Sequence, residues 1–159
     1  MSQVRLRQVL SDLPAYVAGK GDAGKVVKLS SNELPFPPSK PIIEAGKQAL
    51  VGTNRYPDAI GGNLVAKLAA HYRLHPEHVV VGPGSIQVLA NALSTVAQAG
   101  NNVVYAWRSF EAYPILVGIT GASSRQIPLN SDGSHDLDAI LSAVDENTAA
   151  VILLSLIHI

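Results

Sequence analysis

Residues 82–85, Gly-Pro-Gly-Ser, have the composition of an anion-binding turn. The apolar segment His78–Val81 precedes them and predicts a buried strand. Apolar residues then recur at helical spacing: Ile86, Leu89, Leu93 and Val96. The backbone N–H groups of a helix N-terminus lack intrahelical partners, and glycines let an anion approach them closely. The turn therefore predicts a phosphate cradle, with a plain strand-to-helix connection as the alternative.

A second glycine motif, at residues 19–24, matches Gly-x-Gly-x-x-Gly letter for letter. A dinucleotide fingerprint of this form follows a strand and opens a helix. Here Pro14 precedes the motif and the β-rich segment Lys25–Leu29 follows it. The turn at Gly82 has the right context but no third glycine, so neither motif predicts a dinucleotide site.

Three histidines lie close together in the sequence: His71, His75 and His78. They do not predict a metal site, because Pro76 ends the helix and no cysteine or nearby carboxylate pair completes a tetrahedral set. We interpret them as residues at a helix C-terminus, where the dipole favours a protonated histidine. Asp136 and Asp138 are interpreted as helix-start residues rather than a catalytic carboxylate pair.

The balance of charged residues and the lack of cysteine indicate which kinds of ligand and partner the protein has. Lys+Arg and Asp+Glu are equal at 12 each, so there is no excess charge for a nucleic acid or an anionic membrane. The absence of cysteine excludes disulfides and thiolate metal sites and is compatible with a reducing cytoplasm. The longest apolar run, Ala149–Leu154, is too short to span a bilayer. We expect a cytoplasmic protein with small-molecule ligands, no metal, and no nucleic-acid or membrane partner.

Strand and helix patterns alternate along the chain after an N-terminal arm. Proline and glycine punctuate residues 1–38, where one short strand is predicted at 25–29. Helices are predicted at 41–52, 63–73, 86–96, 109–119 and 137–144, and strands at 78–81, 102–107, 124–127 and 149–154. Such alternation with near-continuous Val, Ile and Leu strands predicts an α/β fold, with a mostly parallel sheet and helices on both faces.

Four short motifs follow one another in a fixed order: Ser30–Glu33, Asn54–Asp58, Val81–Ser85 and Trp107–Pro114. Together they resemble the first half of the histidinol-phosphate aminotransferase family, fold-type-I enzymes that use pyridoxal 5'-phosphate (PLP). The resemblance covers roughly residues 6–153. It implies an N-terminal arm over 1–38, followed over 39–153 by part of the large PLP-binding domain, truncated.

The resemblance implies that five residues bind the cofactor. Gly84, Ser85 and the backbone N–H of Ile86 match the phosphate cradle, although many relatives carry Asp where Ile86 stands. Tyr56 matches a tyrosine that the neighbouring subunit donates to the PLP phosphate, by a charge-assisted hydrogen bond. Phe110 matches the aromatic residue that stacks on the pyridine ring, whereas the nearby Trp107 and Tyr113 resemble pocket wall and core.

Two further residues match positions near the substrate in that family. Tyr16 corresponds to an arm tyrosine that reaches across the dimer toward the substrate's phosphate, and Asn32 lies in a loop that borders the substrate. Leu34 stands where the family usually has asparagine or an aromatic residue, which changes the polarity of that wall.

The implied reaction is ping-pong transamination between an amino donor and a 2-oxo acceptor by a homodimer, with PLP as the electron sink. The first expectation is conversion of histidinol phosphate and 2-oxoglutarate to imidazole acetol phosphate and glutamate, in histidine biosynthesis. The motif at Trp107–Pro114 also resembles a branch that acts on phenylalanine and other aromatics. An aromatic amino acid aminotransferase is therefore the alternative.

The family's Schiff-base lysine belongs to a motif beyond Ile159, so we expect no catalytic residue within the chain. The segment Leu154–Ile159 stands where the family turns into Asn-Pro-Asn-Asn-Pro-Thr-Gly. It is also one reading frame of CTGTCTCTTATACACATC, a transposase adapter used in sequencing libraries. We interpret 154–159 as an adapter artefact, with a native apolar strand as the alternative. A catalytically inactive truncated fragment is accordingly the hypothesis of another class.

Overall fold

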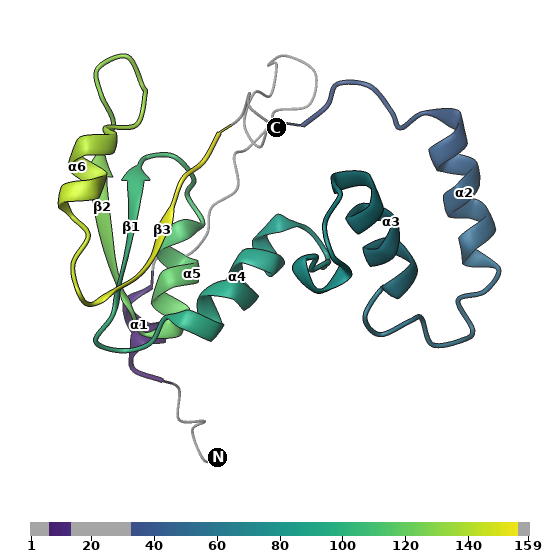
Figure 1. Cartoon of the computed structure of the whole chain (residues 1–159), viewed down its shortest axis with the longest axis horizontal. Helices are drawn as coiled ribbons and strands as arrows, with labels where there is room; N and C mark the ends of the chain where they lie inside the picture. Colours follow the sequence, from purple (N-terminus) through teal and green to yellow (C-terminus); the bar gives the residue numbers. More distant parts are fainter. Residues whose placement is uncertain (1–6, 14–32, 156–159) are drawn as a thin grey trace. The chain divides into compact units, whose positions relative to one another are not determined.

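The computed structural model describes residues 7–13 and 33–155 (Figure 1). Within these ranges the chain divides into two compact units. The larger unit comprises residues 7–13 and 82–155, and the smaller unit comprises residues 33–81. Each unit is built from helices, and the larger unit adds a parallel sheet, so the predicted α/β class is confirmed.

A three-stranded parallel sheet in the order β2-β1-β3 forms the centre of the larger unit (Figure 1). Its strands are β1 (Asn102–Trp107), β2 (Ser123–Pro128) and β3 (Thr148–Ile152). The register pairs Val103 of β1 with Ser124 of β2 and with Ala150 of β3. The first five residues of β1 are all buried, as expected for the middle strand of a parallel sheet covered on both faces.

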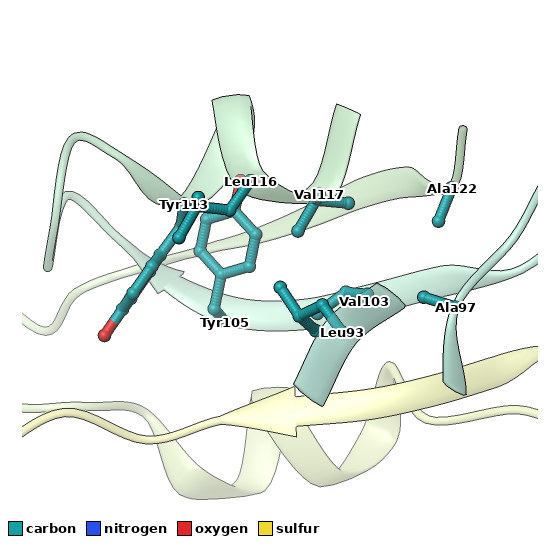
Figure 2. Packing of buried hydrophobic residues seen from close by; sticks show 8 residues of the cluster. All are labelled: Leu93, Ala97, Val103, Tyr105, Tyr113, Leu116, Val117 and Ala122. Carbon is teal, nitrogen blue, oxygen red and sulfur yellow. The ribbon is translucent and has the colours of Figure 1, made fainter. Parts of the chain in front are cut away.

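Helices cover both faces of this sheet. Successive side chains of β1 point to opposite sides, so each face has its own apolar side chains to bury. On one face lie α4 (Ser85–Val96) and α5 (Tyr113–Thr120), and on the other lies α6 (Leu137–Ser142) (Figure 1). The α4 and α5 face has a core of Leu93, Ala97, Val103, Tyr105, Tyr113, Leu116, Val117 and Ala122 (Figure 2). The α6 face has a smaller core of Val104, Ala106 and Ile140.

The position of Pro114 explains why α5 begins four residues later than predicted. The apolar pattern indicated a helix from 109, but α5 begins at Tyr113 and so places Pro114 in its first turn. A proline there loses no intrahelical hydrogen bond, whereas a start at 109 would have put its ring inside the helix. Residues 108–112 instead form a turn, and Gly121 at φ 90° ends α5.

The smaller unit contains α2 (Lys40–Leu50), α3 (Gly62–Tyr72) and the short 3-10 helix η2 (Pro76–His78). The predicted strand at 78–81 is wrong. Val79 has extended backbone angles, but residues 79–81 pair with no strand among the described residues, and the Val80 side chain is 70% exposed. An apolar, extended segment becomes a strand only when a neighbour supplies its hydrogen bonds. The strand predicted at 25–29 lies outside the described residues.

Polar side chains tie the three strands together at their amino ends. Asp145 accepts hydrogen bonds from Asn102 of β1 (3.0 Å) and from Thr148 of β3 (3.2 Å). Its other oxygen lies 2.6 Å from the Arg125 guanidinium of β2. The hydrogen bond from Asn102 is the largest of the causes, ahead of Arg125, that lower the pKa of Asp145 to about 2. Charge and hydrogen bonding therefore fix this edge of the sheet.

We expect Asp145→Asn to lower the free energy of unfolding at neutral pH by removing the ion pair with Arg125. The Asp145 pKa lies below its ordinary value of 3.8 in the folded chain, so its stabilising contribution is complete above that pH and is lost as the pH falls toward 2. Urea unfolding across this range should show the difference between the variant and the parent shrinking. Substitution of the neighbouring residue, Glu146→Gln, is the control. If Asp145→Asn lowered the free energy of unfolding by the same amount at neutral pH and near pH 2, the account would be contradicted.

A short helix, α1 (Val9–Asp12), is anchored on α5 within the larger unit. The Arg7 guanidinium donates a hydrogen bond to the carbonyl oxygen of Ile119 at 2.9 Å. Leu13 lies directly over Gly118, where an added side-chain methyl group would overlap Leu13 Cδ2. The glycine thus leaves the notch that Leu13 fills.

We expect Gly118→Ala to release this anchor, although alanine is normally the better helix residue. Leu13 would have to leave the notch, so the Leu10 and Ser11 amides of α1 should exchange with solvent faster. The matched control is Leu13→Ala, in whose background Gly118→Ala should cause no further change in exchange. Unchanged protection of α1 in the single Gly118→Ala variant would show that the notch is not the anchor.

Candidate functional site

The first turn of α4 presents unpaired backbone donors. Gly84 is the residue before the helix, and no side chain caps the helix N-terminus with a hydrogen bond. The first helical bond runs from Val88 N–H to the Gly84 carbonyl (3.3 Å), and within the described part of the chain no acceptor pairs with the N–H groups of Ser85, Ile86 and Gln87. These residues are exposed. Together with the positive end of the helix dipole, the three donors can bind an anion such as a phosphate group.

Two positions of this turn favour glycine, for different reasons. Gly84 has φ 93°, a conformation that L residues rarely adopt, and nothing lies within 4 Å of where its Cβ would stand. A Cβ at Gly82 would instead come within 3.0 Å of Val88 Cγ2. The positive φ of Gly84 therefore favours glycine there, Val88 leaves little room for a side chain at Gly82, and the space beside Gly84 is open to a ligand.

Phe110 lies in the turn that follows the carboxyl end of β1, the sheet edge at which open α/β folds bind ligands. It is half-buried against the core on the α4 and α5 face. Its ring centroid lies 5.3 Å from that of Tyr113, at an interplanar angle of 77°. Trp107 packs partly buried on the same core, and Tyr113 is almost fully buried in it.

The other sequence-predicted residues are less fully described. Tyr56 belongs to the smaller unit, and its side chain is fully exposed. Tyr16 and Asn32 lie outside the described residues, whereas Leu34 is 76% exposed. Gly84, Ser85, Ile86 and Phe110 all belong to the larger unit, but among the described residues no hydrogen bond or ring contact joins Phe110 to the turn.

Sequence reasoning missed a hollow of about 700 Å³ at the carboxyl edge of the sheet. Its apolar wall consists of Leu129, Leu137, Leu153 and Leu154, and Arg108 and His135 also line it. Arg108 is already engaged, because it lies 3.4 Å from the Glu111 carboxylate and 5.2 Å from the centre of the Trp107 ring. Its leucines come from separate strand ends and from α6, so local sequence patterns gave no signal for it.

The described residues contain neither a metal-binding cluster nor a membrane-spanning helix. Across 7–13 and 33–155 no group of three or more His, Cys, Asp or Glu side chains could hold a metal ion. In the same ranges no helix is long and apolar enough to cross a membrane. Asp136 caps α6 by accepting the Ala139 N–H at 2.9 Å, which confirms the helix-start interpretation of that aspartate.

Comparison with known proteins places these features in a family. The family model for aminotransferase class I and II matches residues 24–158. An aromatic amino acid aminotransferase from Thermobifida fusca is 43% identical over 149 residues, which cover 92% of this chain and 41% of the relative. The corresponding protein from Corynebacterium efficiens is 42% identical and covers 93% of this chain and 43% of its own length. This chain thus spans about two fifths of the length of these relatives.

Solved structures of aminotransferases are similar to this chain as well. The PLP complex of histidinol-phosphate aminotransferase from Sinorhizobium meliloti is 27% identical with a TM-score of 0.68, over 74% of this chain and 32% of the other. A Thermus thermophilus aspartate aminotransferase mutant has a TM-score of 0.79 over 95% of this chain and 44% of the other, and at 19% identity it supports the fold alone. The family's cofactor is PLP, whose phosphate is the kind of anion that the exposed donors in the first turn of α4 can bind. The chain belongs to the class I and II aminotransferases.

Proposed function

We propose that this chain is part of an aromatic amino acid aminotransferase. The observation that carries the proposal is the agreement among relatives: eight proteins between 37% and 43% identical to this chain, each covering at least 92% of it, share that name. Histidinol phosphate was the first expectation from the sequence, with a role in histidine biosynthesis. The relatives favour the aromatic alternative, which we adopt.

In this proposal the first turn of α4 receives the phosphate of PLP. The N–H groups of Ser85, Ile86 and Gln87 have no competing acceptor among the described residues, and all three residues are exposed. Hydrogen bonds to a phosphate are charge-assisted and stronger than those between neutral groups. Ile86 contributes only its N–H, so this cradle adds no carboxylate that would repel the anion.

Phe110 is proposed to stack on the pyridine ring, and Tyr56 to reach the phosphate from a neighbouring subunit of a homodimer. Bound PLP supplies the electron sink for amino-group transfer, while the protein binds and orients it. Tyr16 and Asn32 are proposed to border the substrate, an amino donor or a 2-oxo acceptor. We assign no catalytic base within these 159 residues. We also propose that residues 1–38 form an N-terminal arm, that 39–153 are part of the large domain, that 154–159 are adapter sequence, and that the protein is cytoplasmic.

Grafting this segment into two hosts tests the proposed substrate class. Residues 1–153 would replace the matching region of the Thermobifida fusca enzyme and, separately, of the Sinorhizobium meliloti enzyme. The ratio of kcat/KM for phenylalanine to that for histidinol phosphate is compared with the ratio of each parent. We expect little change in the first host and a shift toward phenylalanine of about tenfold in the second, equivalent to about 1.4 kcal/mol. A shift toward histidinol phosphate in either host would contradict the proposal.

The controls are paired substitutions at Ser85 in the same hosts. Ser85→Asp places a negative charge beside the proposed phosphate and should weaken cofactor retention strongly, whereas Ser85→Ala removes one hydroxyl and should weaken it less. Retention is read from the absorbance of bound PLP after gel filtration. Equal retention by both variants would show that Ser85 does not face the phosphate.

A further inference from the structure

Four aromatic side chains of the larger unit contact one another in series: Phe110, Tyr113, Tyr105 and Trp107. The ring centroids of Phe110 and Tyr113 are 5.3 Å apart, those of Tyr113 and Tyr105 are 5.4 Å apart, and those of Tyr105 and Trp107 are 6.5 Å apart. The interplanar angles of 77°, 70° and 67° make every contact T-shaped, the arrangement that the ring quadrupoles favour.

The inner part of this series has a fixed orientation. Tyr105 is fully buried, and its hydroxyl accepts a hydrogen bond from Gln126 Nε2 of β2 at 3.2 Å. Tyr113 is 4% exposed and packs beside Tyr105 and Leu116 (Figure 2). Close-packed cores leave such rings little room to turn. Tyr113 therefore presents a fixed ring to its outer neighbour.

The outer ring, Phe110, has fewer constraints of its own. It lies in the turn between β1 and α5, outside both elements, and its carbonyl accepts the Tyr113 N–H at 3.2 Å. Its side chain is half-buried. In either sense of a T-shaped contact, edge onto face or face onto edge, Tyr113 leaves at least one face of Phe110 uncovered.

We propose that Tyr113 is a positioning residue, whose T-shaped contact fixes the Phe110 ring so that a free face can stack on the pyridine ring of the cofactor. The inference rests on the proposed function, because it needs a ligand that carries such a ring. The role belongs to the aromatic ring of Tyr113 and not to its hydroxyl. Burial raises the pKa of Tyr113, so the phenol is neutral in ordinary buffers and contributes no charge.

The test uses the 159-residue chain and pyridoxine 5'-phosphate, which has the ring and phosphate of PLP but no aldehyde to react with surface lysines. Binding is followed by quenching of Trp107, the single tryptophan of the chain. We expect Tyr113→Leu to weaken binding about five- to tenfold and Tyr113→Phe to change it less than about twofold, since phenylalanine keeps the ring. Phe110→Ala should weaken binding at least as much as Tyr113→Leu.

A double-mutant cycle separates positioning from a general effect on the fold. If Tyr113 acts through Phe110, Tyr113→Leu should cause no further loss in a Phe110→Ala background. Full additivity, or unchanged affinity of Tyr113→Leu alone, would overturn the inference. Affinities are compared at a temperature where circular dichroism shows every variant folded, and Tyr113→Met serves if the leucine variant does not fold.

The same titration distinguishes failure of the inference from failure of the proposed function. Pyridoxine without its phosphate should bind the parent chain much more weakly, because the α4 turn then has no anion to hold. If the parent chain binds pyridoxine 5'-phosphate no better than pyridoxine, the phosphate cradle is wrong and the positioning role falls with it. If the parent chain prefers pyridoxine 5'-phosphate to pyridoxine, but Tyr113→Leu binds pyridoxine 5'-phosphate as tightly as the parent, only the positioning role fails.

Discussion

Burial of β1 on both faces is the constraint on which the larger unit depends. Val103, Val104, Tyr105 and Ala106 are all fully buried, so both sides of a single strand must be covered. Helices α4 and α5 cover one side and α6 the other, while β2 and β3 satisfy the hydrogen bonds of its two edges. Burying each valine contributes about 1.5–3 kcal/mol, which makes this arrangement hard to replace. The turn that carries Phe110 leaves the sheet from the end of this same strand.

The two ends of the sheet have different roles. At the amino ends, Asp145 joins all three strands through Asn102, Thr148 and Arg125, and the low pKa of Asp145 follows from those bonds. The proposed ligand-binding parts are left with unsatisfied or exposed groups instead. The first turn of α4 has free N–H donors, and Phe110 is half-buried. The positive φ of Gly84 leaves that turn open to an anion.

Prediction from the sequence succeeded where a local pattern determines the structure, and failed where the structure depends on another segment of the chain. The bounds of β1 were predicted without error, because an uninterrupted apolar run marks a central parallel strand. The segment 78–81 has the same character, but no neighbouring strand among the described residues pairs with it. The late start of α5 could have been predicted from Pro114. The fit of Leu13 against Gly118 could not, because 105 positions separate them and glycine gives no signal of its partner. The proposed aromatic substrate class rests mainly on the names of the relatives, and the motif at Trp107–Pro114 gave only an alternative for it.

The central claim is that the first turn of α4 holds the phosphate of the cofactor, and an NMR titration of the 15N-labelled chain tests it most directly. Pyridoxine 5'-phosphate should move the backbone amide signals of Ser85, Ile86 and Gln87 more than any others, because a hydrogen bond to a phosphate deshields the amide proton. Pyridoxine at the same concentration should leave these three signals in place. Shifts that cluster elsewhere in the chain, or that are equal for the two ligands at α4, would contradict the claim.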